Sequence, residues 1–251
     1  MSSRGENRND AITLETFRKN GFPRVGARPF GRIPKRRSYL IVCEGEKTEP
    51  NYFRALSKCL PRNMVENVVV EGVGGTPDYL LQFAKEKIDE RMRKGQPPFY
   101  YVWLVFDRDD FRHFSDTISA VDALNRKRES MPPRCRALEH WDCAWSNEAF
   151  EIWYLLHFRE ELGGAVSRTR YCEMLTREIR NYTGNGDYEY RKNDPGTFRL
   201  LSPNTVSAIE RAKRCLAHQI AEHGMVASMM NPATRVHLLV ESLLSYLQKG
   251  N

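Results

Sequence analysis

Residues 100–110 read YYVWLVFDRDD, and this stretch decides the fold. Its first seven residues, 100–106, are apolar without the polar–apolar alternation of a half-exposed strand. That pattern is typical of a central strand that is buried on both faces of a parallel sheet. The run stops at Asp107, and Asp109 and Asp110 follow within three residues. Acidic side chains are therefore expected directly beyond the carboxyl end of the strand.

The segments on either side alternate between strand patterns and helix patterns. Short β-branched runs such as SYLIVC and NVVVEG are typical of strands, and each precedes a stretch with apolar residues at helical spacing. We expect strands at 38–43, 67–72, 100–106 and 134–139, with helices at 48–60, 77–93 and 115–130 between them. Because this alternation leaves room for crossover helices, it predicts an α/β fold with a doubly wound parallel sheet.

The rest of the chain divides into a basic arm and a helical region. Residues 1–37 carry ten Lys or Arg and three Asp or Glu, interrupted by Gly and Pro, so we expect a flexible N-terminal arm. The formal net charge of +7 lies entirely in this arm, since the other residues balance. We expect the α/β core at 38–160 and a mainly helical C-terminal extension, packed on the core, at 161–251.

Composition excludes several classes of protein. No run of 18 apolar residues is present, so the sequence predicts no membrane span, and the first ten residues lack the apolar region of a secretory signal. We therefore expect a cytoplasmic protein. The six cysteines form no CxxC pair, which favours scattered reduced thiols over a structural zinc site.

The acidic residues that follow the first and third strands predict a metal site. Glu44 directly follows the first strand, and Asp107 and Asp109 follow the third. Residues at i and i+2 point to the same side in extended chain, so the two aspartates converge and Arg108 points away. If the two strands are neighbours, Glu44 lies opposite them. Carboxylates without His or Cys indicate Mg²⁺ or Mn²⁺. The alternative is that Asp and Glu here only serve turns and helix caps.

These residues carry a resemblance to known families. Glu-Gly after the first strand and Asp-x-Asp after the third resemble the TOPRIM fold, which primases, topoisomerases and OLD-type nucleases share. More specifically, the chain resembles the RloB-like proteins of bacterial defence and restriction loci. The matching segments are IVCEGEKTEPNYF (41–53), VFDRDD (105–110), SNEAFEIWYLLHF (146–158) and NPATRVHLLV (231–240), which together span most of residues 38–249.

The resemblance implies a TOPRIM-like core and Mg²⁺- or Mn²⁺-dependent cleavage of phosphodiester bonds in DNA or RNA, including tRNA, as part of anti-phage defence. It implies that Glu44 is a ligand or general acid–base, that Asp107 and Asp109 hold the metal, and that Glu151 serves a second metal. The alternative for Glu151 is a buried structural ion pair. The resemblance also implies an ATPase partner from the same locus.

Two further positions are predicted to contact substrate. Lys47 lies just after the Glu44 turn, and Arg108 lies between the two aspartates, so both are candidates for binding a phosphate. A solvated surface lysine is the alternative for Lys47. For His157, on an aromatic helix, we expect a hydrogen-bonded core residue.

Two segments outside the acidic motifs, a polar stretch and an Asn-Pro pair, also carry structural signals. The polar stretch 183–198 predicts an exposed loop. Tyr188 and Tyr190, with the preceding Tyr182 and with Arg191 and Lys192, either stack on bases or have no such role. Asn231 and Pro232 are interpreted as the N-cap and first residue of a helix.

Two other functions use the same features. In the first, the chain is a non-catalytic module that binds nucleic acid or a phosphorylated signal, and the acidic residues are structural. In the second, it is a primase-like nucleotidyl transferase that uses the same carboxylates. The absence of a recognisable zinc-binding module in the sequence disfavours the second.

Overall fold

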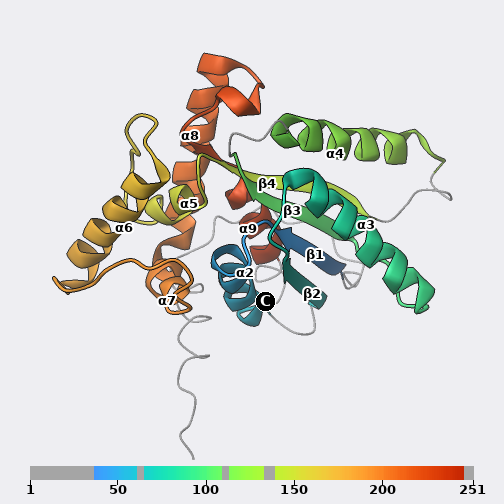
Figure 1. Cartoon of the computed structure of the whole chain (residues 1–251), viewed down its shortest axis with the longest axis horizontal. Coiled ribbons are helices and arrows are strands. Elements are labelled where there is room, and N and C mark those ends of the chain that lie inside the picture. Colours follow the sequence, from blue (N-terminus) through green and yellow to red (C-terminus); the bar gives the residue numbers. More distant parts are fainter. Residues whose placement is uncertain (1–36, 61–64, 109–112, 133–138, 246–251) are drawn as a thin grey trace, which may run out of the picture.

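A computed structural model describes residues 37–60, 65–108, 113–132 and 139–245. They form an α/β fold around one five-stranded sheet with the order β2-β1-β3-β4-β5 (Figure 1). The strands are β1 (Arg37–Cys43), β2 (Val65–Gly72), β3 (Tyr101–Asp107), β4 (His140–Asn147) and β5 (Ala233–Thr234). The first four strands are parallel, and β5 pairs antiparallel with β4. The predicted parallel α/β sheet is confirmed.

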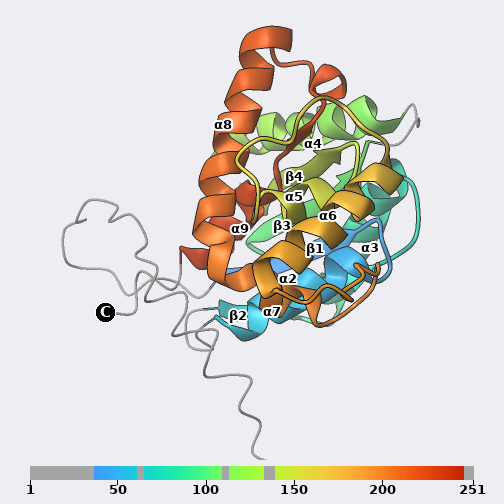
Figure 2. The same ribbon diagram turned by 90° about the vertical axis from the view of Figure 1, so that its left-hand side faces the viewer.

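Helices cover both faces of the sheet. The helices are α2 (Thr48–Lys58), α3 (Pro77–Arg93), α4 (His113–Ser130), α5 (Glu151–Leu155), α6 (Arg168–Thr183), α7 (Thr197–Leu201), α8 (Thr205–His223) and α9 (Val236–Leu244), with 3₁₀ turns η1 (Ser202–Asn204) and η2 (Ala227–Met229). Helices α3 and α4 share a buried cluster on one face, whereas α2 and α5–α9 contribute to the cluster on the other. Figure 2 shows α6 and α2 on the opposite side of the sheet from α4.

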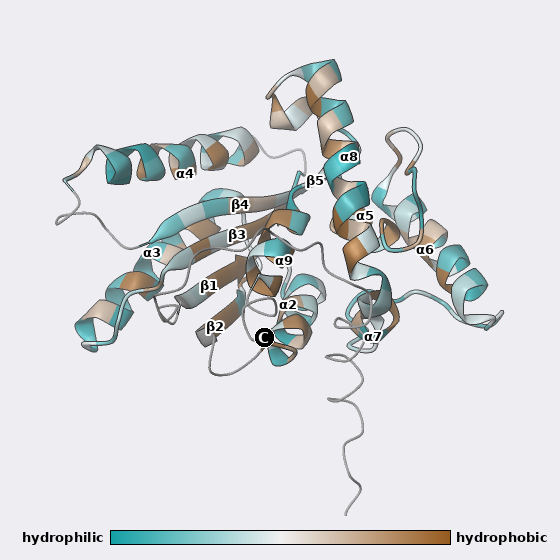
Figure 3. Cartoon of the chain, turned by 180° about the vertical axis from the view of Figure 1, so that it is seen from behind, coloured by the Kyte–Doolittle hydropathy of each residue, from teal (hydrophilic) through white to brown (hydrophobic). Residues whose placement is uncertain are grey.

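The strands supply both clusters because successive side chains of a strand point to opposite faces. In β1, Tyr39, Ile41 and Cys43 join the cluster of α2, while Leu40 and Val42 join that of α3 and α4. All five residues are fully buried. Figure 3 shows the strands β1, β2 and β3 largely brown, and teal patches on the surrounding helices. This burial on both faces is what the uninterrupted apolar runs predicted.

The fourth strand lies later than expected. Most of the predicted strand at 134–139 falls outside the described residues, and the strand observed is His140–Asn147. Its sequence, HWDCAWSN, gives a weak strand signal because polar residues stand at both ends. Ser146 and Asn147 are nevertheless fully buried, since β5 covers this end of β4 and Ser146 Oγ lies 3.0 Å from Thr234 Oγ1. Tertiary contacts therefore override the local pattern.

The C-terminal region returns to the sheet. Asn231 and Pro232 are joined by a cis peptide and lead into β5, and α9 begins only at Val236, so their interpretation as a helix start was wrong. Helix α9 then packs on the face of the sheet that α2 also covers. Ser242 Oγ of α9 lies 2.9 Å from the Tyr39 hydroxyl of β1. One buried cluster runs from Tyr39 to Leu244, so residues on both sides of position 160 share a core.

Two further observations concern the described residues. None of the helices described is both long and apolar enough to cross a membrane. The five described cysteines are free thiols, while Cys135 lies outside the described residues.

Candidate active site

The candidate site lies at the carboxyl ends of β1 and β3, which are adjacent strands. The chain leaves β1 for α2 on one face of the sheet and leaves β3 for α4 on the other. This divergence marks a switch point, and in open parallel sheets the crevice beyond such a point is where ligands bind. Cys43 of β1 pairs with Val105 of β3, so the next residues of both strands meet at this crevice. The predicted proximity of Glu44 to Asp107 follows from this pairing.

Glu44 is fixed to the end of β3 through two hydrogen bonds. Its backbone amide donates to the carbonyl of Val105 at 2.8 Å, and its Oε2 accepts from the backbone amide of Asp107 at 2.9 Å. The Gly74 amide donates to the Glu44 carbonyl at 3.0 Å, which attaches the β2–α3 turn to the same point.

Glu49 is a second carboxylate at this crevice, and the sequence analysis missed it. It lies in the first turn of α2 and is only 7% exposed. Helix N-termini favour negative charge, which stabilises a carboxylate there. A Cβ on Gly45 would stand 2.0 Å from Glu49 Oε2, so glycine after Glu44 leaves the space that the Glu49 carboxylate fills. Burial is the largest cause that raises the pKa of Glu49, and the charge of Glu151 adds to it.

Glu151 begins α5 and is almost completely buried, with 2% of its surface exposed. The Tyr190 hydroxyl donates to Glu151 Oε1 at 3.3 Å, and Lys192 Nζ lies 3.4 Å from the same oxygen. Glu151 is therefore a paired buried acid, as the alternative reading has it, and its charge acts on Glu49 and Asp107. Its role at a second metal stays a prediction.

Asp107 lies at the centre of the group. Its side chain is 12% exposed, and Oδ2 lies 3.3 Å from Arg168 Nη2. Burial raises the pKa of Asp107 well above its ordinary value, the charges of Glu49 and Glu151 raise it further, and Arg168 opposes them. Such a shift, caused by burial and like charges in a crevice, is typical of functional sites.

Arg168 is positioned by the start of α6. Ser167 precedes the helix, and its side-chain oxygen accepts a hydrogen bond from the Arg170 amide at 3.4 Å. This N-cap fixes Arg168 as the first helical residue. Sequence reasoning did not single out Arg168, because nothing in SRTRYC marks which arginine faces the sheet.

The other residues singled out by the sequence are Lys47, Arg108, Asp109 and His157. Lys47 is exposed at the start of α2, and Arg108 is half-buried beside β4, its amide donating to the Ser146 carbonyl at 2.8 Å. Asp109 lies outside the described residues. His157 is a core residue, since it is buried and its Nδ1 lies 2.9 Å from the Trp153 carbonyl.

The acidic side chains at this switch point carry hard oxygen donors only. Glu44, Glu49, Asp107 and Glu151 offer only carboxylate oxygens, which Mg²⁺ and Mn²⁺ prefer and which suit zinc less well. In the part of the chain that the structure describes, no three acidic, His or Cys side chains stand close enough together to hold an ion. Asp107 and Glu151 are instead paired with Arg168 and Lys192.

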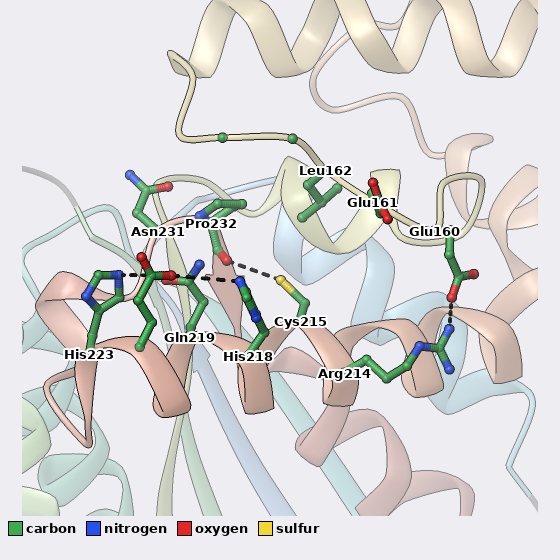
Figure 4. Close-up of a pocket in the computed structure, with 13 residues that line it drawn as sticks. Glu160, Glu161, Leu162, Arg214, Cys215, His218, Gln219, His223, Asn231 and Pro232 are labelled. Atoms are coloured by element: carbon green, nitrogen blue, oxygen red, sulfur yellow. Dashed lines mark hydrogen bonds and ion pairs between the residues drawn. The ribbon is translucent and has the colours of Figure 1, made fainter.

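A separate pocket of about 680 Å³ lies between α8 and the segment 160–164 (Figure 4). Here Arg214 pairs with Glu160, Cys215 Sγ lies 3.2 Å from the Pro232 carbonyl, and Glu222 stands between two histidines, His218 and His223. None of the four clustered carboxylates lines this pocket, so it is not the candidate active site.

Comparison with known proteins identifies the family. A family model described as RloB-like protein matches residues 39–243. The chain belongs to the RloB-like protein family. The RloB-like match begins in β1 and ends in α9, so it includes all four clustered carboxylates together with Arg168 and Lys192. Among the curated proteins and the solved structures, no match was found.

Proposed function

We propose that this chain is a divalent-metal-dependent nuclease, and that it cleaves phosphodiester bonds of DNA or RNA at the carboxyl ends of β1 and β3. The observation that carries the proposal is the gathering of Glu44, Glu49, Asp107 and Glu151, three of them mostly buried, around one crevice of a parallel sheet. Buried like charges are costly unless a cation compensates them, so a group of this kind favours a cation site.

In this proposal Glu44, Glu49, Asp107 and Glu151 hold Mg²⁺ or Mn²⁺, together with Asp109, which stays a predicted ligand. When bound, such an ion neutralises the charge of the scissile phosphate and lowers the pKa of a coordinated water. Burial and the neighbouring carboxylates raise the pKa of Asp107, which opposes the ionised form that binds a metal, and the Arg168 guanidinium favours that ionised form. Lys47 and Arg108, at the rim, then contact the nucleic-acid backbone.

The wider role rests on the resemblance and the family. The motifs Glu44-Gly45 and Asp107-x-Asp109 resemble those of TOPRIM and OLD-type nucleases, and the RloB-like family membership supports a place in bacterial anti-phage defence. We include in the proposal that the chain acts in the cytoplasm with an ATPase partner encoded at the same locus. The net charge of +7, carried by residues 1–37, suits an anionic partner.

The test compares two glutamates of one turn. Purified parent, Glu44→Gln and Glu46→Gln are incubated with DNA, tRNA and other RNA, in Mg²⁺, in Mn²⁺ and in EDTA, alone and with the ATPase partner. Glu46 is exposed and two residues from Glu44, so it is a matched control. We expect cleavage by the parent and by Glu46→Gln in metal only, with Glu44→Gln nearly inactive. Failure of the parent to cut any substrate in any metal, or full activity of Glu44→Gln, would contradict the proposal.

One observation favours a second candidate, a non-catalytic module that binds nucleic acid or a phosphorylated signal. Arg168 and Lys192 already pair with Asp107 and Glu151, so internal cations compensate part of the acidic charge. Binding of nucleic acid that is unchanged in EDTA and in Glu44→Gln, without cleavage, would support this module. Incorporation of nucleotides would instead support a primase-like transferase.

A further inference from the structure

The segment after α6 crosses the candidate site. Helix α6 ends at Gly184, whose φ of 70° turns the chain back. The returning chain is attached to α6 by two hydrogen bonds, from Arg180 Nε to the Tyr188 carbonyl at 2.7 Å and from the Tyr190 amide to Thr176 Oγ1 at 3.1 Å. Tyr190 is 7% exposed. Tyr190 is therefore not exposed for base stacking, and the alternative reading, without such a role, holds for this tyrosine.

Beyond Tyr190 the chain is exposed but still contacts the site. We call residues 191–195 the strap; all five are exposed. Within it, Lys192 Nζ lies 3.4 Å from Glu151 Oε1. Asn193 contacts α2 twice, because its Oδ1 accepts from Thr48 Oγ1 at 3.2 Å and its carbonyl accepts from Asn51 Nδ2 at 3.4 Å. The strap thus joins two elements that each supply a clustered carboxylate, Glu49 from α2 and Glu151 from α5.

We propose that the strap is an autoinhibitory contact that places the Lys192 ammonium where a divalent cation would otherwise act on Glu151. Metal binding and strap closure then exclude one another, so the enzyme rests with its carboxylates paired internally. The inference rests on the proposed function, since it concerns the same carboxylates. It adds a reason why Glu151 faces Lys192 in the described structure.

The contacts of the strap suit a segment that can release. Lys192 keeps 44% of its side chain exposed, so solvent screens its pair with Glu151 and the ammonium can leave without burying a charge. Both hydrogen bonds of Asn193 to α2 are exposed. Tyr190, by contrast, is buried and stays attached to Glu151. Release therefore involves the residues after Tyr190 and leaves α6 and the core in place.

Neighbouring residues provide a matched pair for the test. Lys192→Met and Arg191→Met each remove one positive charge from adjacent positions, but Arg191 pairs only with Glu189 of its own loop among the described residues. Asn193 has a φ of 74°, which glycine adopts without strain, so Asn193→Gly removes the Thr48 hydrogen bond and keeps the backbone.

The experiment measures Mn²⁺ binding to the full chain. Binding is monitored as the loss of the electron paramagnetic resonance signal of free Mn²⁺. If the strap is closed about nine-tenths of the time, its removal tightens the apparent Kd by about tenfold. We expect that change in Lys192→Met, a smaller change in the same direction in Asn193→Gly, and the parent value in Arg191→Met.

Limited proteolysis gives a second readout. In the parent, Mn²⁺ should accelerate trypsin cleavage after Arg191 and Lys192. Cleavage after Lys94, which is exposed at the C-terminal end of α3, should stay constant and controls for the activity of the protease. Equal Mn²⁺ affinity in all four proteins, or proteolysis that Mn²⁺ leaves unchanged, would overturn the strap and leave the nuclease proposal intact. Absence of Mn²⁺ binding in every variant would overturn both.

Discussion

Glu44 Oε2 accepts a hydrogen bond of 2.9 Å from the backbone amide of Asp107. The two residues follow neighbouring parallel strands, so this bond closes the carboxyl ends of β1 and β3 against each other. It also fixes the Glu44 carboxylate relative to the backbone of β3 without using the Asp107 side chain. The Asp107 carboxylate stays available for Arg168 and for the proposed cation.

We expect Asp107→Asn to change how stability depends on pH. The pKa of Asp107 is raised in the folded protein, mainly by burial, from an ordinary value of 3.8. Above that pH the folded chain retains a proton that the unfolded chain has lost, so the stability due to Asp107 falls as pH rises. Asparagine cannot ionise. The Tm of Asp107→Asn minus that of the parent should therefore increase from about pH 4 to about pH 8, in EDTA.

The control for this experiment is Asp116→Asn, which removes an exposed carboxylate from the first turn of α4. Its Tm difference from the parent should vary much less with pH. A flat difference for Asp107→Asn as well would contradict a raised pKa of Asp107 in the folded protein. The same variant should lose nuclease activity, so stability and function change in opposite directions.

Glu49→Gln should weaken metal binding although it keeps the shape of the side chain. Glu49 is buried beside Gly45 and acts electrostatically on Asp107, so its charge belongs to the cluster. We expect a loss of about 10- to 100-fold in Mn²⁺ affinity, together with reduced cleavage. Calorimetry of Mn²⁺ binding measures the first effect directly. Glu46→Gln, which removes an exposed charge nearby, should bind as the parent does; equal affinity of Glu49→Gln and parent would exclude Glu49 as a ligand.

His157 should make the protein sensitive to acid. Burial lowers the pKa of His157 from 6.5 to about 3, so below pH 6.5 the unfolded chain binds a proton that the folded chain rejects. Stability is therefore lost as pH falls, by up to about 1.4 kcal/mol for each pH unit. The variant His157→Leu has no histidine to protonate at this position, so it does not lose this stability. The difference in unfolding free energy between parent and variant should therefore shrink from about pH 7 to about pH 4.

Urea unfolding at several pH values measures this effect. His218→Leu, at an exposed position of α8, is the control, and its difference from the parent should vary much less with pH. A difference for His157→Leu that does not vary with pH would contradict a neutral buried histidine. Since His157 is a core residue, cleavage by the folded variant should persist.

Gly72→Ala should damage the fold at the edge of the site. A Cβ on Gly72 would stand 2.6 Å from Pro50 Cγ and 2.7 Å from the Gly45 carbonyl oxygen. Overpacking of this kind costs about 1–3 kcal/mol of unfolding free energy. A Cβ on Gly164 meets nothing within 4 Å, so Gly164→Ala should stay within about 0.5 kcal/mol of the parent. Equal stabilities of the two variants in urea would show that the β2–α3 turn does not press on the Glu44 turn.

Much of the core followed from local pattern. The strands β1, β2 and β3 and the helices α2, α3 and α4 lie close to their expected positions, because apolar periodicity is a property of neighbouring residues. The fourth strand and β5 did not follow, since HWDCAWSN and NPAT become buried through distant segments: β4 pairs with β3, and its last two residues pair with β5. The residues of the candidate site likewise fall into those that local pattern indicates and those that it does not. Glu44 and Asp107 were identified at strand ends, whereas Glu49 reads as an ordinary first-turn glutamate until its burial against Gly45 is seen.

The sequence by itself determined that this is an α/β chain with acidic residues at the carboxyl ends of two strong strands, because both features are written in short stretches of residues. Only the tertiary structure decided that β1 lies beside β3, that α2 and α5 bring Glu49 and Glu151 to the same crevice, and that Arg168 and Lys192 pair with the acids there. Those relationships join segments far apart in the chain. They depend on strand order and helix packing, and no local pattern of residues encodes either one.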